Sequence, residues 1–426
     1  MKTSTDRHAT KPSRWGKTPR RGMRRIAVTL LVALLPVACA SHEAPRNGAP
    51  ATPGQSQAGN YLAGRHAQAE REIGAAVRFL NAALEKDPDN TELLRRTFML
   101  MAIDGHFDKA VALAKRLDGE KNKSSIAAMV LVIADIRDKR FDAADERLRG
   151  LPAAEGLNVF MVPLLRAWSL VGQGDIDAAL KALAPLAANK GFTAMREMHH
   201  GLINEVAGRN DAAVQHYLNT VTSRNGLSLR LVEILGALYE RMGQADKARA
   251  LYHKYADEHP TSPLIGPALA RLQAGSASKQ PVRSAAEGAA EALFGVSNSV
   301  RQRSTQDAAL LFGRMALILK PNFPLAQILI ADILETDNRL AMANDVYRAI
   351  DPASPFAWSA RLSIAANLNR MERTDEAVDQ LRAMAKENPA QPESLINLGD
   401  ILRGHERFDE AIAAYDQAFA RIDKLQ

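Results

Sequence analysis

The last third of the chain alternates apolar and polar residues in the manner of two amphipathic helices, with a tight turn between them and another turn before the next pair. Four alanines mark the second helix of successive pairs, and each lies 34 residues after the one before: Ala309, Ala343, Ala377 and Ala411. Three prolines keep the same interval: Pro321, Pro355 and Pro389. A fixed period of this length predicts stacked copies of one helix–turn–helix unit.

The period continues upstream, so we predict ten repeats. The earlier anchor alanines follow one another at the same interval or at one position more: Ala248, Ala213, Ala179, Ala144, Ala110 and Ala76. Eight units carry an aspartate two residues before the anchor: Asp108, Asp142, Asp177, Asp211, Asp246, Asp307, Asp375 and Asp409. Each carboxylate is expected to accept hydrogen bonds from free N–H groups where the second helix starts, contributing about 1 kcal/mol. Five units carry a proline that is expected to end the second helix: Pro88, Pro260, Pro321, Pro355 and Pro389.

The final unit, residues 392–425, shows the pattern most completely. Its marker residues are Leu395, Leu398, Gly399, Leu402, Ala411, Tyr415 and Ala418. This unit resembles the tetratricopeptide repeat. The resemblance implies small residues where the two helices cross, here Gly399 and Ala411, and large ones such as Tyr415 beside them; a larger side chain at the crossing would overpack it by roughly 1–3 kcal/mol. We therefore predict an all-α solenoid of about ten such repeats.

The repeats are expected to form two arrays. The first array, repeats 1–6, covers residues 57–262, and the second, repeats 7–10, covers residues 285–426. The sixth and seventh anchors, Ala248 and Ala309, lie almost two periods apart, so the period breaks between them. Residues 263–284 are predicted to hold a short cap helix and a flexible linker rich in Gly and Ser. Whether the two arrays stack or hinge is left open by the sequence.

The N-terminal part of the chain, before the first repeat, does not follow the repeat pattern. Residues 1–38 place arginines before an apolar run, Ile26–Ala38, as a secretory signal peptide does. Cys39 follows directly and is the single cysteine of the chain. This arrangement resembles the lipobox of a bacterial lipoprotein, in which the thiol receives a diacylglycerol, although Pro36 stands where leucine is preferred. Residues 39–56 read as a flexible tether.

By that resemblance the mature protein is anchored to the outer membrane and faces the periplasm. The alternative is an ordinary cleavage site and a soluble periplasmic protein, and Met23 is an alternative start. Residues 1–38 hold nine of the 55 Lys and Arg and one of the 48 Asp and Glu. The rest of the chain then carries 46 basic and 47 acidic side chains, which removes the main support for nucleic-acid binding.

No motif with the spacing of an active site occurs. The chain lacks a Gly-rich phosphate loop, His-Glu-x-x-His, Cys-x-x-Cys and Gly-x-Ser-x-Gly. His199 and His200 are adjacent and point in different directions on a helix, which disfavours a shared metal site. Met195 and Met198 share a helical face that fills the repeat core or adapts to a partner. We expect no enzyme activity, cofactor, metal or small-molecule substrate.

The resemblance implies a concave groove lined by the first helix of each pair. In the second array its positions give Phe294, Asn298, Arg301, Ile328, Asp332, Glu335, Asn369, Asp400 and Arg403. Their mixture of apolar and charged groups suits an extended peptide or a partner helix. The chain resembles the repeat lipoproteins of the bacterial envelope. This resemblance implies a scaffold or adaptor for an envelope machine that serves secretion, pilus assembly, outer-membrane assembly or polysaccharide export. The alternative, a glycan- or peptidoglycan-associated protein, would need aromatic platforms, and Trp168 and Trp358 lie far apart in sequence.

Overall fold

The computed structural model describes residues 52–118, 124–152, 156–224, 226–260, 262–302 and 305–423. All of them belong to one compact unit, Pro50–Gln426. The signal, Cys39 and most of the tether therefore lie outside the described residues. Within the described part the chain is helical and contains no strand. None of its helices combines the length and the apolar character that a membrane span requires.

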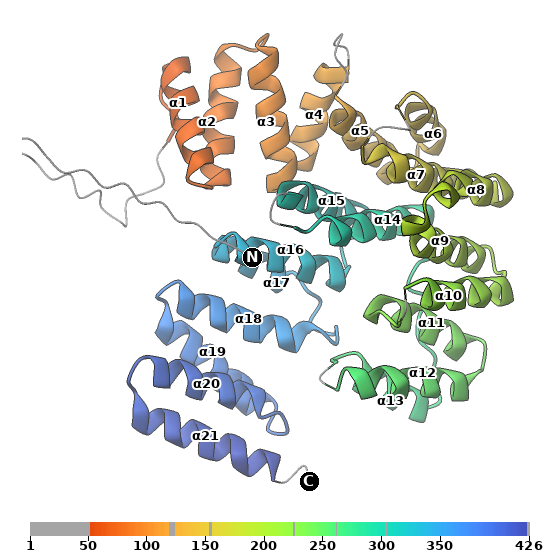
Figure 1. Cartoon of the computed structure of the whole chain (residues 1–426). Helices are drawn as coiled ribbons and strands as arrows, with labels where there is room; N and C mark the ends of the chain where they lie inside the picture. The colour runs from red at the N-terminus through yellow and green to blue at the C-terminus, as the bar shows by residue number, and fades with distance from the viewer. Residues whose placement is uncertain are drawn as a thin grey trace, which may run out of the picture. The chain divides into compact units, whose positions relative to one another are not determined.

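The prediction of an all-α repeat solenoid is confirmed, since twenty of the helices form ten consecutive pairs (Figure 1). The pairs of the first array are α1 (Gln57–Ala69) and α2 (Ile73–Lys86), α3 (Thr91–Asp104) and α4 (Phe107–Asp118), α5 (Ser125–Arg137) and α6 (Phe141–Arg149), α7 (Asn158–Gln173) and α8 (Ile176–Ala182), α9 (Thr193–Val206) and α10 (Asn210–Arg224), and α11 (Leu229–Arg241) and α12 (Ala245–Glu258). Two short 3₁₀ turns, Ala184–Ala188 and Lys190–Phe192, follow α8. After the extra helix α13 (Ile265–Gln273) come α14 (Ala285–Ser299) and α15 (Gln306–Leu319), α16 (Pro324–Thr336) and α17 (Leu340–Arg348), α18 (Ala357–Arg370) and α19 (Thr374–Glu387), and α20 (Glu393–Gly404) and α21 (Phe408–Ile422).

The anchor alanines mark the close contact between the two helices of a pair. All ten lie in the second helix, and each is at most 3% exposed. Gly399 shows why the facing residue is small, because a Cβ atom added there would lie 2.5 Å from the ring of Tyr415. Gly236 and Tyr252 repeat this contact at 2.4 Å.

The turn inside nine of the pairs uses a left-handed residue five positions before the anchor, which the sequence analysis did not predict. Nine repeats show a positive φ there, at Gly105, Gly174, Gly208, Gly243, Arg71, Lys139, Asn338, Glu372 and Glu406. The non-glycine residues have φ between 57° and 62°, a conformation that costs about 1–2 kcal/mol for most side chains. Stacking of the two helices outweighs this local cost.

Two details of the predicted helix ends are wrong. The aspartates lie in the first turn of the second helix rather than at its cap: α6 begins at Phe141, and its cap residue Arg140 makes no side-chain capping bond. Asp142 therefore acts through its charge near the helix N-terminus. Pro355 is not a helix stop either, because α17 already ends at Arg348. The other four prolines follow the last helical residue by two positions.

The segment between the arrays makes specific contacts. Helix α13 packs against α12. The Ser278 N–H donates to Glu240 Oε2 at 2.6 Å, and the Pro281 carbonyl accepts from Lys320 Nζ at 2.7 Å. Val282 is only 2% exposed. A flexible linker, which the Gly/Ser composition suggests, would lack such contacts.

Helices α14 and α15 pack onto the first array (Figure 1). Helix α14 contacts α5, α7 and α9, and α15 contacts α3 and α5. Gly288 permits this approach, because a Cβ atom there would lie 2.2 Å from the indole ring of Trp168 in α7. Arg339, the cap residue of α17, and Asp104 of α3 are both almost fully buried and form an ion pair of 3.4 Å. The face shared by the first helices of repeats 2–5 is thus covered by repeat 7 of the same chain.

Candidate functional site

A pocket of 460 Å³ lies among α9, α11, α14 and α16. Its apolar lining comes from Met195, Met198, Leu229, Phe294 and Leu325. The volume falls within the range of about 300–1,000 Å³ that is usual for binding pockets. Methionine side chains adapt to the shape of what they contact. Nearly all of the lining belongs to first helices of repeats, the helices that the resemblance assigns to partner binding.

His199 supplies a fixed polar group to this pocket. It lies on α9, is 3% exposed, and its Nδ1 atom accepts a hydrogen bond of 3.0 Å from Trp168 Nε1. Burial lowers the pKa of His199 to about 4, with Glu291 raising it and His200 lowering it further. The ring is therefore neutral at pH 7, and its proton is on Nε2. No described residue accepts a hydrogen bond from Nε2, so a donor is available in the pocket.

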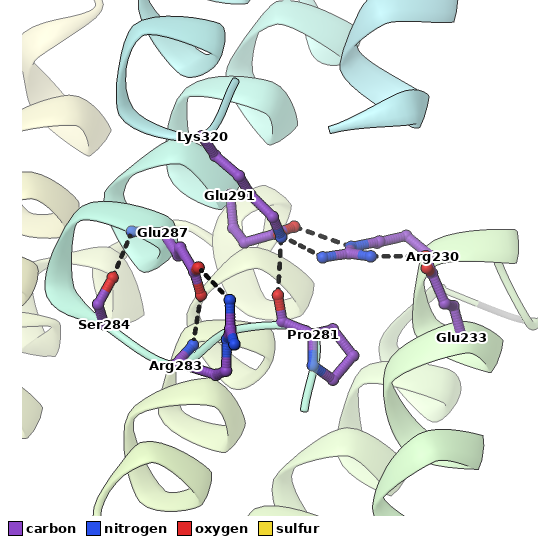
Figure 2. Close-up of polar contacts among 8 residues, drawn as sticks. All are labelled: Arg230, Glu233, Pro281, Arg283, Ser284, Glu287, Glu291 and Lys320. Carbon is purple, nitrogen blue, oxygen red and sulfur yellow. Dashed lines mark hydrogen bonds and ion pairs between the residues drawn. The ribbon is translucent and has the colours of Figure 1, made fainter. Parts of the chain in front are cut away.

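The lining of the pocket also includes Arg230 and Glu291, which belong to a buried ion network that joins the two arrays (Figure 2). Arg230 of α11 binds both carboxylate oxygens of Glu291 of α14, with its Nε atom 2.9 Å from Oε2. Arg230 also donates to Glu233 at 2.5 Å. Lys320 Nζ lies 3.1 Å from Glu291 Oε1. Two cations and two carboxylates leave the network neutral.

The pKa shifts show how strongly these charges are coupled. Burial alone would raise the pKa of Glu291, but Arg230 and Lys320 outweigh burial and hold it below its usual value. Burial lowers the pKa of Lys320 by more than Glu291 raises it. For Arg230, burial is outweighed by Glu291 and Glu233, and the pKa is raised. Glu291 therefore stays ionised, and removing a cation would leave a buried charge uncompensated.

The start of α14 is fixed by local hydrogen bonds, which places Glu291 one turn later (Figure 2). Ser284 is the cap residue, and its Oγ accepts from the Glu287 N–H at 3.2 Å. Glu287 Oε2 in turn accepts from the Arg283 N–H at 2.6 Å. Such reciprocal bonds satisfy N–H groups that the first turn of a helix leaves free.

Of the predicted groove residues, the structure brings Phe294 and Asn298 together in this pocket. Phe294 packs against Phe323 with ring centroids 4.9 Å apart, and Asn298 is exposed. Arg301 is exposed just after α14, and Ile328 packs against the core.

The other predicted residues lie along α16, α18 and α20 and mostly bind within the repeats. Asp332 accepts from the Tyr347 hydroxyl at 3.1 Å and Glu335 accepts from Asn367 at 2.6 Å. The remaining contacts are Asn369 with His405 at 2.8 Å, Asp400 with Tyr415 at 2.8 Å, and Arg403 with Asp400 at 3.4 Å. Partner binding by all nine residues stays a prediction.

Sequence reasoning missed His199 as a pocket residue and did not single out Arg230. The pair Met195 and Met198 was the available signal. Trp168 is fully buried and engaged with His199, so it offers no platform for a sugar ring. In the described part of the chain no group of His, Cys, Asp and Glu side chains is arranged to hold a metal ion.

Two segments of the chain match known families. Residues 234–262 and 367–423 match two models of the tetratricopeptide repeat. No curated protein sequence matches the chain.

Several solved structures are similar to this chain at low TM-scores. The crystal structure of MamA is 14% identical, with a TM-score of 0.28, over 45% of this chain and 95% of that one. The structure of Naa15/Naa10 bound to HypK-THB is 16% identical, with a TM-score of 0.35, over 87% and 66%. The APC/C hetero-tetramer Cut9-Hcn1 is 15% identical, with a TM-score of 0.31, over 87% and 80%. These values are too low to indicate a shared partner or function.

Proposed function

We propose that this protein, whose helix pairs are tetratricopeptide repeats, is an exported, non-enzymatic scaffold that holds partner proteins at the cell envelope. Tetratricopeptide repeats are a protein-interaction fold, and the sequence contains no catalytic motif. The observation that carries the proposal is the pocket in which the predicted residues Phe294 and Asn298 meet Met195, Met198 and His199. The partner machine would serve secretion, pilus assembly, outer-membrane assembly or polysaccharide export.

The pocket fits a partner segment that inserts one apolar side chain and presents one oxygen. The apolar side chain would contact Met198 and Phe294, and a carbonyl or carboxylate oxygen would accept from His199 Nε2. A hydrogen bond to this donor contributes about 0.5–1.5 kcal/mol, which favours a ligand with an oxygen at that point. This combination matches the few well-placed polar groups and apolar walls of a typical binding pocket.

A photo-crosslinking residue placed at Asn298, at the exposed rim of the pocket, tests this interaction in cells. A discrete protein should be crosslinked, and Ala194→Phe, which fills the pocket from α9, should lower the yield several-fold. Ala383→Phe is the matched control, because Ala383 is exposed on α19 and does not line the pocket. Equal yields in both variants, or recovery of glycan in place of protein, would contradict the proposal and favour the glycan-associated alternative.

The lipid anchor is proposed from Cys39 and the apolar run before it. Cys39→Ser should prevent acylation and release the protein from membranes, whereas Ser41→Ala, two residues away, should leave it in the outer-membrane fraction. Metabolic labelling with a fatty acid followed by fractionation measures both effects. Unlabelled wild-type protein in the soluble periplasmic fraction would favour the soluble alternative.

A further inference from the structure

The last helix, α21, presents an apolar stripe to solvent. Phe408, Ile412 and Phe419 are 57%, 58% and 66% exposed, and they are three of the eight large apolar side chains that are exposed in the described part of the chain. Their spacing of four and seven residues places them on one helical face. Asp409 and Asp416 are exposed along the same side of the helix.

The repeat period shows what covers this face elsewhere in the chain. Ile412 follows its anchor alanine by one residue, as Val378 does in α19, and Phe419 follows it by eight, as Ala385 does. Val378 is 2% exposed and Ala385 5%, because α20, the first helix of the next repeat, packs against α19. The stripe on α21 therefore corresponds to a surface that a neighbouring helix covers in the internal repeats.

The internal repeats also indicate the chemistry of that neighbour. In α4 the pair Phe107 and Asp108 occupies the positions of Phe408 and Asp409. Arg137 of the following repeat lies 5.3 Å from the Phe107 ring and donates to Asp108 at 2.7 Å. Asp375 of α19 holds the same repeat position as Asp108, and Arg407 of the following repeat lies 3.6 Å from it. No described residue forms an ion pair with Asp409.

We propose that the exposed face of α21 binds an amphipathic helix of a partner protein, with an arginine of that helix over Phe408 and paired with Asp409. A second copy of this chain fits less well, because two α21 faces in contact would bring Asp409 and Asp416 near the same aspartates of the other copy, and these like charges would repel each other. The basic residue near the end of α21, Arg421, is already occupied, since it donates to the carbonyls of Ala385, Asn388 and Gln391. This surface is separate from the pocket and does not depend on the lipid anchor.

The test supplies the proposed helix from the chain itself. A second copy of residues 393–407, which span α20 and its turn, is added directly after Gln426, one repeat period after the original segment. The copy then continues the repeat period. Its counterpart of Arg407 lies where it can pair with Asp409, as Arg407 itself lies near Asp375. The extended chain should melt about 3 °C or more above the native chain. Ile412→Lys should abolish this gain but leave the melting temperature of the native chain nearly unchanged, because Ile412 is 58% exposed there.

A charge exchange tests the arginine separately. Replacing the copy of Arg407 by glutamate should reduce the gain, and adding Asp409→Lys should restore it. An unchanged melting temperature in the extended chain would overturn the proposal, because the face would then not accept a helix. Sedimentation of the native chain at increasing concentration is the second measurement. A dimer that Ile412→Lys abolishes would show that a second copy occupies the face and would also overturn the proposal.

Discussion

Gly288 should control the packing of repeat 7 onto the first array. A Cβ atom there would lie 2.2 Å from the Trp168 ring, whereas ordinary contacts begin at about 3.4 Å, so the ring would have to move by more than an ångström. Trp168 is fully buried and is held by its hydrogen bond to His199. The ring cannot move that far without losing this bond. Overpacking of this kind costs about 1–3 kcal/mol.

Gly295, on the same helix α14, supplies the matched control, because a Cβ atom there meets nothing within 4 Å. Both Gly→Ala changes gain roughly 0.5–1 kcal/mol of helix propensity. This gain cancels in the comparison. Gly288→Ala should therefore be less stable than Gly295→Ala by about 1–3 kcal/mol, the overpacking term alone.

Urea unfolding followed by tryptophan fluorescence measures this difference. In a Trp358→Phe background the signal of the described part comes from Trp168, so the assay also reports its surroundings. Gly288→Ala should shift the native emission as well as the midpoint. Equal free energies of unfolding for Gly288→Ala and Gly295→Ala would refute the packing of α14 against α7.

Three further predictions concern the core and the buried charges. Ala343→Leu should lower the melting temperature through overpacking, while Ala341→Leu, exposed on the same helix, should not; equal melting of the two would count against the assigned repeat register. The folded-state pKa of His199, about 4, lies below its usual 6.5, so the unfolded state binds a proton at this histidine first as the pH falls. Up to about 3 kcal/mol of stability is therefore lost between pH 6.5 and 4. Thermal melts should show a smaller acid-induced loss in His199→Phe than in the wild type, and identical losses would contradict the shift. Glu291→Gln leaves Arg230 without its main partner and should destabilise by about 3–5 kcal/mol in urea; a loss below 1 kcal/mol would mean that the network is not buried as described.

The repeat units could be predicted because their causes are local and periodic. Each anchor alanine is buried against its own first helix, so the same residue type recurs at a fixed interval. The left-handed turn residue five positions earlier escaped prediction for the opposite reason. Glycine fills it in four repeats, but Arg71, Lys139 and Glu372 show that packing of the two helices imposes the conformation on residues that do not favour it.

The packing of repeat 7 onto the first array could not be predicted from the repeat period. It depends on the contact between Gly288 and Trp168 and on the ion pair between Arg230 and Glu291, which join residues far apart in the chain. The period reports contacts only between neighbouring repeats. The long interval between the sixth and seventh anchors showed where the period breaks, but not where the chain goes next.

The candidate site could be predicted only where it depends on positions within a single repeat. Phe294 and Asn298 follow from their positions within a repeat, which the resemblance to a known family supplies. The other side of the pocket comes from α9 and α11, the first helices of repeats 5 and 6, and is present because α14 packs against the first array. His199 becomes a directed donor only through its bond to Trp168, and adjacency to His200 carries no sign of that bond.

This packing also decides where a partner can bind at low free-energy cost. A partner that uses the face shared by the first helices of repeats 2–5 must displace α14 and α15, which means separating Arg230 from Glu291 in a buried environment. A partner at the pocket, or on the exposed face of α21, displaces no described helix. The two proposed surfaces are therefore favoured over the covered face, although the covered face belongs to the helices that the family resemblance would select. Weaker packing in Gly288→Ala should expose that face, so a partner that gains affinity for this variant would be one that competes with repeat 7.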